Sequence, residues 1–189
     1  LNNLQTGKQV TDYTDVSSSA WYYDAAKYVT DKQLMSGEKP YVFGADEALT
    51  RAEVASALYN LAGQPKVELA SFTDVPVTHQ ARTAIAWAAK TGIMKGVGDN
   101  KFEPDRSVSR EEIATLLTRQ RKLSGVDVTA DKNEVSAFVD SAKISSWAVD
   151  GVAYCTKSGL VKGNPGKVFA PAGNTTRAEL ATIIQRIAA

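Results

Sequence analysis

Thr50-Arg51-Ala52-Glu53 is the stretch that decides the fold, because the chain repeats its pattern at Ser109-Arg110-Glu111-Glu112 and Thr176-Arg177-Ala178-Glu179. Apolar residues at helical spacing follow each copy. A hydroxyl residue followed three positions later by Glu is the capping-box pattern, in which both side chains satisfy backbone N–H groups that lack an intrahelical partner. The three copies therefore predict three helix starts.

Capping does not explain the arginine in each copy. A cation in the first turn faces the positive end of the helix dipole, which is unfavourable by up to ~1 kcal/mol. Arg51, Arg110 and Arg177 therefore need a compensating negative charge. Physics alone leaves two sources open. One is a local carboxylate, and the other is a bound anion held jointly by the guanidinium and the helix N-terminus.

The rest of the chain follows the same period. An aromatic-x-Asp pattern ends at Asp15, Asp74 and Asp140, with 59 residues from the first to the second and 66 from the second to the third. Later in each unit a glycine precedes a phenylalanine by six positions, and that phenylalanine precedes the capping hydroxyl by seven. The glycines are Gly37, Gly96 and Gly163. Such locked spacing predicts three units with one common fold.

A first helix is expected in each unit before the glycine. In the first unit Trp21, Ala25, Tyr28 and Val29 fall on one helical face, and Trp147 and Cys155 take equivalent positions in the third. The helix is expected to end at the glycine, through a special backbone conformation. The phenylalanine after it is expected to plug the core beneath a turn, and Cys155 to fill a small buried position.

We divide the chain into a leader (1–12) and repeats at 13–65, 66–125 and 126–189. The connector 122–136 is the longer one and should be mobile or carry a short added element. Two helices and a loop bury too little surface to be stable alone, so the units should share one core. The predicted class is all-α, and periodicity allows either a linear stack or a closed pseudo-threefold trimer.

Composition restricts the function further. The chain of 189 residues has 43% hydrophobic and 23% charged residues, which is typical of globular protein. No segment approaches the roughly 20 apolar residues that span a bilayer. The start is polar and predicts no signal peptide, although a processed chain would look the same. A net charge of +1 argues against nucleic acid as a partner, and the single cysteine excludes an intrachain disulfide.

The sequence offers little for catalysis. His79 is the one histidine and has no equivalent in the other repeats. No Ser-His or Cys-His pairing, phosphate-binding glycine loop or cluster of metal ligands is found, so we expect no catalytic residue, metal or cofactor. Asp74 with Glu112 is a remote possibility for glycoside hydrolysis by paired carboxylates. The threefold recurrence of these carboxylates suits binding better.

Together these motifs resemble the surface-layer homology (SLH) domain in its three-copy arrangement, over residues 13–189. The resemblance implies a pseudo-threefold trimer with a central three-helix bundle. It also implies grooves between lobes that bind secondary cell-wall polysaccharide, commonly through a pyruvate ketal on N-acetylmannosamine. Such domains anchor secreted S-layer proteins non-covalently to the bacterial cell wall, without a cofactor. A ketal carboxylate is an anion suited to an arginine at a helix start, and this favours the bound-anion reading.

The resemblance also implies roles for site residues. Arg51, Arg110 and Arg177 would contact the carboxylate, and Asp15, Asp74 and Asp140 would accept hydrogen bonds from sugar hydroxyls or amide. Trp21 and Trp147 would provide an apolar face, and Gly37, Gly96 and Gly163 would admit the ligand close to backbone. Structural alternatives are that the aspartates cap the first helices, the tryptophans belong to the core, and the glycines serve turn geometry.

Repeat two carries Gln80 where the others have tryptophan. The resemblance implies that a groove draws its arginine from one repeat and its aspartate and tryptophan from a neighbour. We expect unequal grooves, with those that use Trp21 or Trp147 the better ones. Replacement of Arg110 should therefore affect binding less than replacement of Arg51 or Arg177. A module that recognises peptidoglycan or a protein partner is the alternative function. The internal repetition indicates a monomer in isolation.

Overall fold

A computed structural model describes residues 9 and 12–188, and all of its regular elements are helices. Over this part of the chain no β-strand forms, and only isolated β-bridges join extended segments. The predicted all-α class is therefore confirmed. The predicted leader (1–12) lies outside the described residues except for residues 9 and 12, and the repeat boundaries stay a prediction.

Each repeat contributes a shorter and then a longer helix. Repeat one forms α1 (Tyr23–Asp31) and α2 (Arg51–Leu61), and repeat two forms α3 (Arg82–Lys90) and α4 (Arg110–Leu123). Repeat three forms α5 (Val149–Lys157) and α6 (Arg177–Ala188). Two 3₁₀ helices, η2 (Lys132–Ala137) and η3 (Ser141–Lys143), lie between α4 and α5, and η2 packs against α5. The longer connector thus ends in the short added element that its length suggested.

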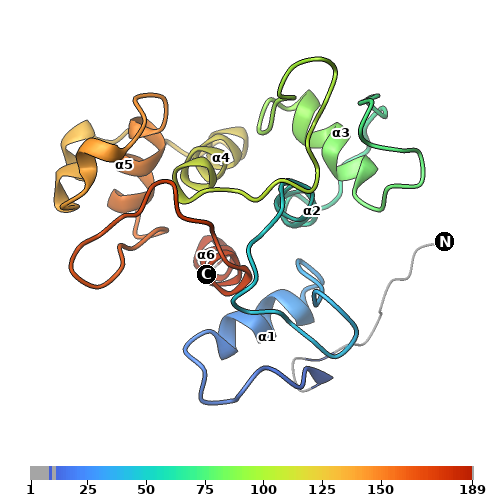
Figure 1. Cartoon of the computed structure of the whole chain (residues 1–189), viewed down its shortest axis with the longest axis horizontal. Helices are drawn as coiled ribbons and strands as arrows, with labels where there is room; N and C mark the ends of the chain where they lie inside the picture. The colour runs from blue at the N-terminus through green and yellow to red at the C-terminus, as the bar shows by residue number, and fades with distance from the viewer. Residues whose placement is uncertain (1–8, 10–11, 189) are drawn as a thin grey trace.

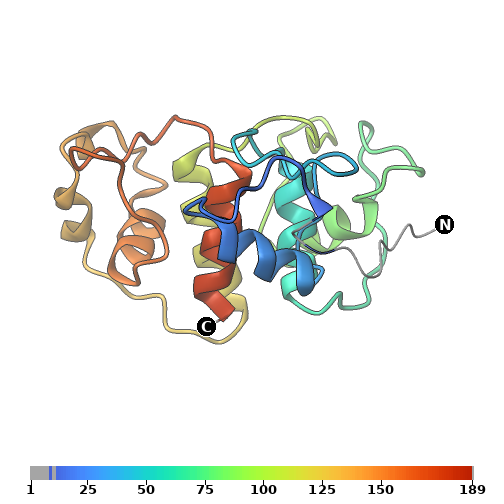
Figure 2. The same ribbon diagram turned by 90° about the horizontal axis from the view of Figure 1, so that it is seen from below.

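The shorter helix of each repeat packs against the longer helix of a different repeat. α3 packs on α2, α5 packs on α4, and α1 packs on α6. The last of these pairs joins the first repeat to the third, so that each repeat contacts both of the others. Figure 1 shows α2, α4 and α6 end-on near the centre, with α1, α3 and α5 outside them. Figure 2 shows α2 and α6 running along the same direction.

A ring of backbone hydrogen bonds joins the segments that lead into the three longer helices. The Leu49 N–H donates to Thr175 O (2.9 Å), the Thr175 N–H to Val108 O (3.0 Å), and the Val108 N–H to Leu49 O (2.9 Å). These cyclic bonds hold the N-termini of α2, α4 and α6 together. The pseudo-threefold trimer stays a prediction, and the ring of bonds and the circular packing support it.

The core contains the phenylalanine of each repeat. Phe43, Phe102 and Phe169 have no exposed surface. Each ring packs against the aromatic residue of its own aromatic-x-Asp pattern, with centroid distances of 5.5, 5.4 and 5.1 Å. Replacing such a residue with alanine typically costs about 3–5 kcal/mol. The prediction that these rings plug the core is confirmed.

The first helices are shorter at both ends than the sequence suggested. α1 begins at Tyr23, so Trp21 precedes it, and Trp147 likewise precedes α5. α1 ends at Asp31, and the residue with positive φ that ends it is Gln33 (56°). Gly92 (75°) and Gly159 (69°) take this position after α3 and α5. The expectation that the helices end at Gly37, Gly96 and Gly163 was wrong, because a left-handed residue several positions earlier already ends each one.

Candidate functional site

The three capping boxes form as predicted. The Thr50 hydroxyl accepts from the Glu53 N–H (3.2 Å), and the Glu53 carboxylate accepts from the Thr50 N–H (2.8 Å). Ser109 with Glu112, and Thr176 with Glu179, repeat this reciprocal pair. Each glutamate therefore has one carboxylate oxygen facing its own helix start.

The three arginines are buried, and each reaches into the repeat that follows it in the cyclic order. Arg110 Nε donates to Phe169 O (2.7 Å) and Arg110 Nη2 to Lys162 O (3.0 Å), so this side chain holds the loop of repeat three. The guanidinium also lies over the Phe169 ring, at 5.5 Å from its centroid. Equivalent bonds join Arg51 to Phe102 O and Lys95 O, and Arg177 to Phe43 O and Ser36 O. The arginines thus also stabilise the contacts between repeats.

Carboxylates compensate two of these arginines directly. Arg110 Nη1 pairs with Glu179, and Arg177 Nη1 lies 2.6 Å from Glu53 Oε1. The local-carboxylate reading therefore holds for both, although each carboxylate belongs to the neighbouring repeat. The helix starts thus hold a carboxylate against each of these arginines, and in the protein alone that carboxylate is a capping-box glutamate.

Arg51 differs from the other two. The equivalent glutamate, Glu112, is held by Arg106 instead, through bonds of 2.6 and 3.2 Å. Over the part of the chain that the structure describes, no carboxylate pairs with Arg51. Burial and then the nearby Arg106 charge lower the pKa of Arg51, and they outweigh the neighbouring carboxylates, which raise it. The positive charge of Arg51 is thus incompletely compensated.

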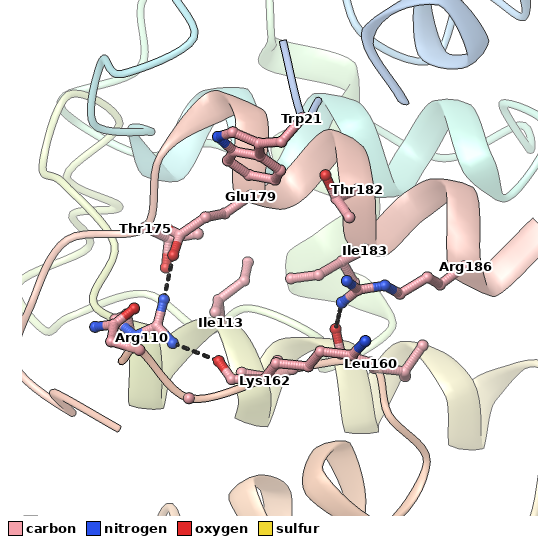
Figure 3. Close-up of a pocket in the computed structure, with 13 residues that line it drawn as sticks. Trp21, Arg110, Ile113, Leu160, Lys162, Thr175, Glu179, Thr182, Ile183 and Arg186 are labelled. Carbon is pink, nitrogen blue, oxygen red and sulfur yellow. Dashed lines mark hydrogen bonds and ion pairs between the residues drawn. The ribbon is translucent and has the colours of Figure 1, made fainter. Parts of the chain in front are cut away.

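A cavity of about 240 Å³ opens beside Arg110. Its lining comes from all three repeats and includes Trp21 of repeat one, Arg110 of repeat two and Glu179 of repeat three (Figure 3). Gly163, Thr182 and other residues of the third repeat complete the wall. We call these residues the Arg110 site. An anion, an apolar ring and hydroxyl groups could all find partners in this one space.

The two predicted stacking residues are strongly exposed. Trp21 has 69% and Trp147 has 56% of its surface accessible, which is unusual for so large an apolar side chain. Neither belongs to the core, so the core alternative for these tryptophans was wrong. In Figure 3 Trp21 lies near Glu179 and Thr182 of α6, the helix on which α1 packs.

The cavity combines a tryptophan of one repeat with an arginine of another, as the resemblance implied. Trp21 lines the cavity that contains Arg110, so Arg110 does not belong to the groove without tryptophan. Because α3 packs on α2 as α1 packs on α6, Gln80 takes the place of Trp21 beside Glu53 and its partner Arg177. The ranking of Arg110 below Arg51 and Arg177 stays a prediction, and the tryptophan beside Arg110 argues against it. The ranking took Gln80 and Arg110 together because both lie in repeat two, whereas Trp21 and Arg110 of the cavity come from different repeats, as the resemblance implied.

The three aspartates hold the loops of their own repeats. Asp15 Oδ1 accepts from the Phe43 N–H and Oδ2 from the Gly44 N–H, both at 2.8 Å. Asp74 and Asp140 accept equivalent bonds. Burial raises the pKa of Asp74 and of Asp140. The backbone N–H donors together lower it by more than burial raises it, so the pKa of each carboxyl lies below its usual value. The aspartates therefore do not cap the first helices, and their bonds to sugar groups stay a prediction.

The three glycines are required by close packing. A Cβ on Gly163 would lie 2.7 Å from Phe138 Cε1, and one on Gly37 would lie 2.5 Å from Tyr13 Cε1. A Cβ on Gly96 would lie 2.9 Å from Lys101 O. Each glycine thus lets the aromatic ring or the loop backbone of its repeat approach closely. Gly163 also lines the cavity, so the ligand role proposed for it remains compatible with its packing role.

Residues in the third turn of the longer helices were missed by the sequence analysis. Arg186 lines the cavity, and its Nη1 donates to Leu160 O (2.9 Å). Arg119 makes the same bond to Ile93 O (3.0 Å), although the sequence analysis did not single it out as a site residue. Asn60 stands at this position in repeat one and donates to Leu34 O. The repeat register would have identified this position, since two of its three residues are arginine.

The candidate catalytic groups have structural roles. Cys155 is fully buried, as predicted, and burial raises its pKa to about 12 against the smaller effect of the Thr118 hydrogen bond. His79 Nδ1 accepts from the Ala81 N–H just before α3. Within residues 9 and 12–188, no group of three or more His, Cys, Asp or Glu side chains could hold a metal ion. In the same residues, no helix is long and apolar enough to cross a membrane.

Comparison with known proteins identifies the family. The model of the S-layer homology domain matches residues 12–55, 71–114 and 137–181. The amylopullulanase of Thermoanaerobacterium thermosulfurigenes is 32% identical over 91% of this chain and 9% of its own length. The exoglucanase XynX of Acetivibrio thermocellus is 31% identical over 97% of this chain and 17% of its own length.

An S-layer protein of Bacillus thuringiensis subsp. finitimus is 27% identical over 92% of this chain and 21% of its own length. The chain thus spans less than a quarter of the length of each of these relatives. Three matched repeats cover most of the chain and coincide with the repeated capping boxes, so the resemblance drawn from the motifs is confirmed. The chain belongs to the S-layer homology domain family.

Proposed function

We propose that the spaces between repeats bind an anionic cell-wall polysaccharide, and that this binding anchors the larger protein to the bacterial wall. The observation that carries the proposal is the cavity in which the buried Arg110 and the exposed Trp21 meet. A cation and a flat apolar surface in one groove suit a sugar that bears a carboxylate. The family and its S-layer members indicate a location at the cell surface, and cell-wall anchoring agrees with both.

The ligand class that fits best is a glycan with a pyruvate ketal on N-acetylmannosamine. Its carboxylate would pair with Arg110 beside Glu179, where charge-assisted hydrogen bonds are roughly twice as strong as neutral ones. One face of the sugar would stack on Trp21, a contact worth about 1 kcal/mol. Thr182 would face its hydroxyl groups.

The same roles extend to two further sites through the repeated contacts. We call them the Arg51 site, with Glu112 and Trp147, and the Arg177 site, with Glu53 and Gln80. Arg51 and Arg177 would contact the carboxylate, with Trp147 beside the former and Gln80 beside the latter. Gly37, Gly96 and Gly163 would let the ligand approach the loop backbone. For Asp15, Asp74 and Asp140 we propose that they hold the loop in place, in addition to any hydrogen bond from the sugar.

We further propose that the chain is a binding module and a monomer in isolation, and that it has no catalytic role. Asp74 and Glu112, the best candidate pair for glycoside hydrolysis, are both engaged in structural hydrogen bonds. The glucanase and amylopullulanase relatives extend far beyond the region that they share with this chain. Incubation with wall polymer should therefore release no new reducing ends.

Co-sedimentation with bacterial walls tests the proposal. The protein should bind native walls and lose binding after chemical removal of pyruvate. A Trp21→Ala/Trp147→Ala variant should also bind native walls less, and it should fold because both side chains are exposed. Equal binding to native and depyruvylated walls would point to peptidoglycan, and binding to neither would point to a protein partner. Either result would overturn the proposal.

A further inference from the structure

At two of the three helix starts a capping-box glutamate already pairs with the arginine to which a ligand carboxylate would bind. Glu179 pairs with Arg110, and Glu53 Oε1 lies 2.6 Å from Arg177 Nη1. An incoming carboxylate must share the guanidinium or displace the glutamate from it. Each hydrogen bond that the ligand gains is then offset by one that the protein loses, so the net gain is small.

Among the residues that the structure describes, no carboxylate forms an ion pair with Arg51. Both oxygens of Glu112 are engaged by Arg106, and the Ser109 N–H donates to Oε2 as well (2.9 Å). Arg106 is held in turn by Glu103, 3.1 Å from its Nε. Arg51 donates to the backbone carbonyls of Phe102 and Lys95 and lies over the Phe102 ring. Within the described part of the chain, a ligand carboxylate would therefore not compete with an ion pair for this arginine.

Arg106 is specific to this site. By the repeat register its position is occupied by Glu47 in repeat one and by Gly173 in repeat three, and neither can hold a glutamate. The other two sites therefore lack any equivalent means of drawing the capping-box carboxylate away from the helix-start arginine. This difference does not follow from the motifs, which are the same in all three repeats.

The structure also places the segment before Trp147 at the start of α4, the helix whose first turn carries Glu112. Glu111, next to Glu112, accepts from the Ser145 N–H (2.8 Å) and from the Ser145 hydroxyl (2.9 Å). These bonds fix the segment just before Trp147 on the first turn of α4. Gly151 of α5 packs directly on the Thr115 backbone, one turn further along α4. An exposed indole thus lies at the same helix start as Glu112 and Arg106.

We propose that Arg106 is a specificity-determining residue, which holds Glu112 away from Arg51 and thereby makes the Arg51 site the tightest of the three for a saccharide carboxylate. The proposal rests on the proposed function and ranks its sites. The Arg110 site has a tryptophan but a competing Glu179. The Arg177 site has a competing Glu53 and Gln80 in place of tryptophan. The difference of one charge-assisted hydrogen bond corresponds to about tenfold in affinity.

Fluorine NMR of protein labelled with 5-fluorotryptophan can read the sites separately, because the chain has three tryptophans. Trp147 reports on the Arg51 site, Trp21 reports on the Arg110 site, and the buried Trp87 is the internal control for folding. The probe is a wall oligosaccharide with pyruvylated N-acetylmannosamine, with its depyruvylated form as control. We expect the Trp147 signal to reach half-saturation at about tenfold lower concentration than the Trp21 signal.

Two variants test the role of Arg106. Arg106→Ala releases Glu112 to pair with Arg51, so half-saturation at Trp147 should rise about tenfold while that at Trp21 stays unchanged. Adding Glu112→Gln should restore tight binding, because glutamine keeps the capping box but is neutral. Trp147 saturation at or above the concentration for Trp21, or an Arg106→Ala variant without effect at Trp147, would overturn the inference and leave the proposed function intact. If neither signal responds to the pyruvylated probe, both proposals fail.

Discussion

Replacement of Trp21 by alanine is the change that most cleanly separates binding from folding. Trp21 is 69% exposed and lies outside the core, so its loss should change the free energy of unfolding by less than about 0.5 kcal/mol. It lines the cavity beside Arg110, and a sugar ring stacked there would cover one face of the indole. The variant should therefore bind more weakly without unfolding.

The size of the effect follows from the covered area. One face of an indole buries roughly 50 Å² of apolar surface, which at about 25 cal/mol per Å² is worth about 1.2 kcal/mol. Aromatic stacking energies of about 0.5–1.5 kcal/mol agree with this value. Affinity at the Arg110 site should fall by about five- to tenfold.

The backbone amide of Gly163, which lines the same cavity, provides a site-specific NMR signal for the titration. Soluble oligosaccharide should be used, because a polymer that occupies several sites would hide the loss at one. Gln80→Ala, at the equivalent position of repeat two, is the matched control and should leave the Gly163 titration unchanged. Gln80→Trp should improve binding at the Arg177 site. Unchanged affinity at Gly163 in Trp21→Ala would refute the stacking role.

Four further outcomes follow from the packing and the pKa shifts. The buried Thr175 hydroxyl has no hydrogen-bond partner among residues 9 and 12–188, so Thr175→Val should raise the free energy of unfolding by about 1 kcal/mol in urea denaturation. Gly163→Ala should lower it by about 2 kcal/mol or more in the same assay, because the new Cβ meets Phe138. The pKa of Asp140 is lower in the folded than in the unfolded protein, so its contribution to stability is present above the usual value of 3.8 and lost as pH falls below it. Acid titration of Asp140→Asn should show a smaller loss over that range. Cys155 should resist a thiol reagent in the folded protein and react only after unfolding, because it is buried and its pKa is raised to about 12.

The sequence was sufficient for the parts of the fold that depend on local spacing. The capping boxes at Thr50, Ser109 and Thr176 predicted the starts of α2, α4 and α6, because capping involves residues only three positions apart. The buried phenylalanines followed from their fixed distance to these starts. The limits of the first helices did not, since Gln33 ends α1 in a conformation more typical of glycine.

The composition of each site could not be obtained in the same way, because it depends on contacts between repeats. Trp21 and Arg110 are far apart in sequence and meet only because α1 packs on α6 beside the start of α4. The pairing of Arg106 with Glu112 is likewise invisible in the motif, where Arg51, Arg110 and Arg177 look alike. Spacing within a repeat identified the side chains, and the circular packing of repeats decides which of them share a site.

The most direct test of the central claim is the crystal structure of the protein in complex with a pyruvylated wall oligosaccharide. The account predicts that the pyruvate carboxylate lies against the guanidinium of a helix-start arginine, with a sugar ring on Trp21 or Trp147. Saccharide bound away from Arg51, Arg110 and Arg177, or with its carboxylate facing solvent, would contradict the account.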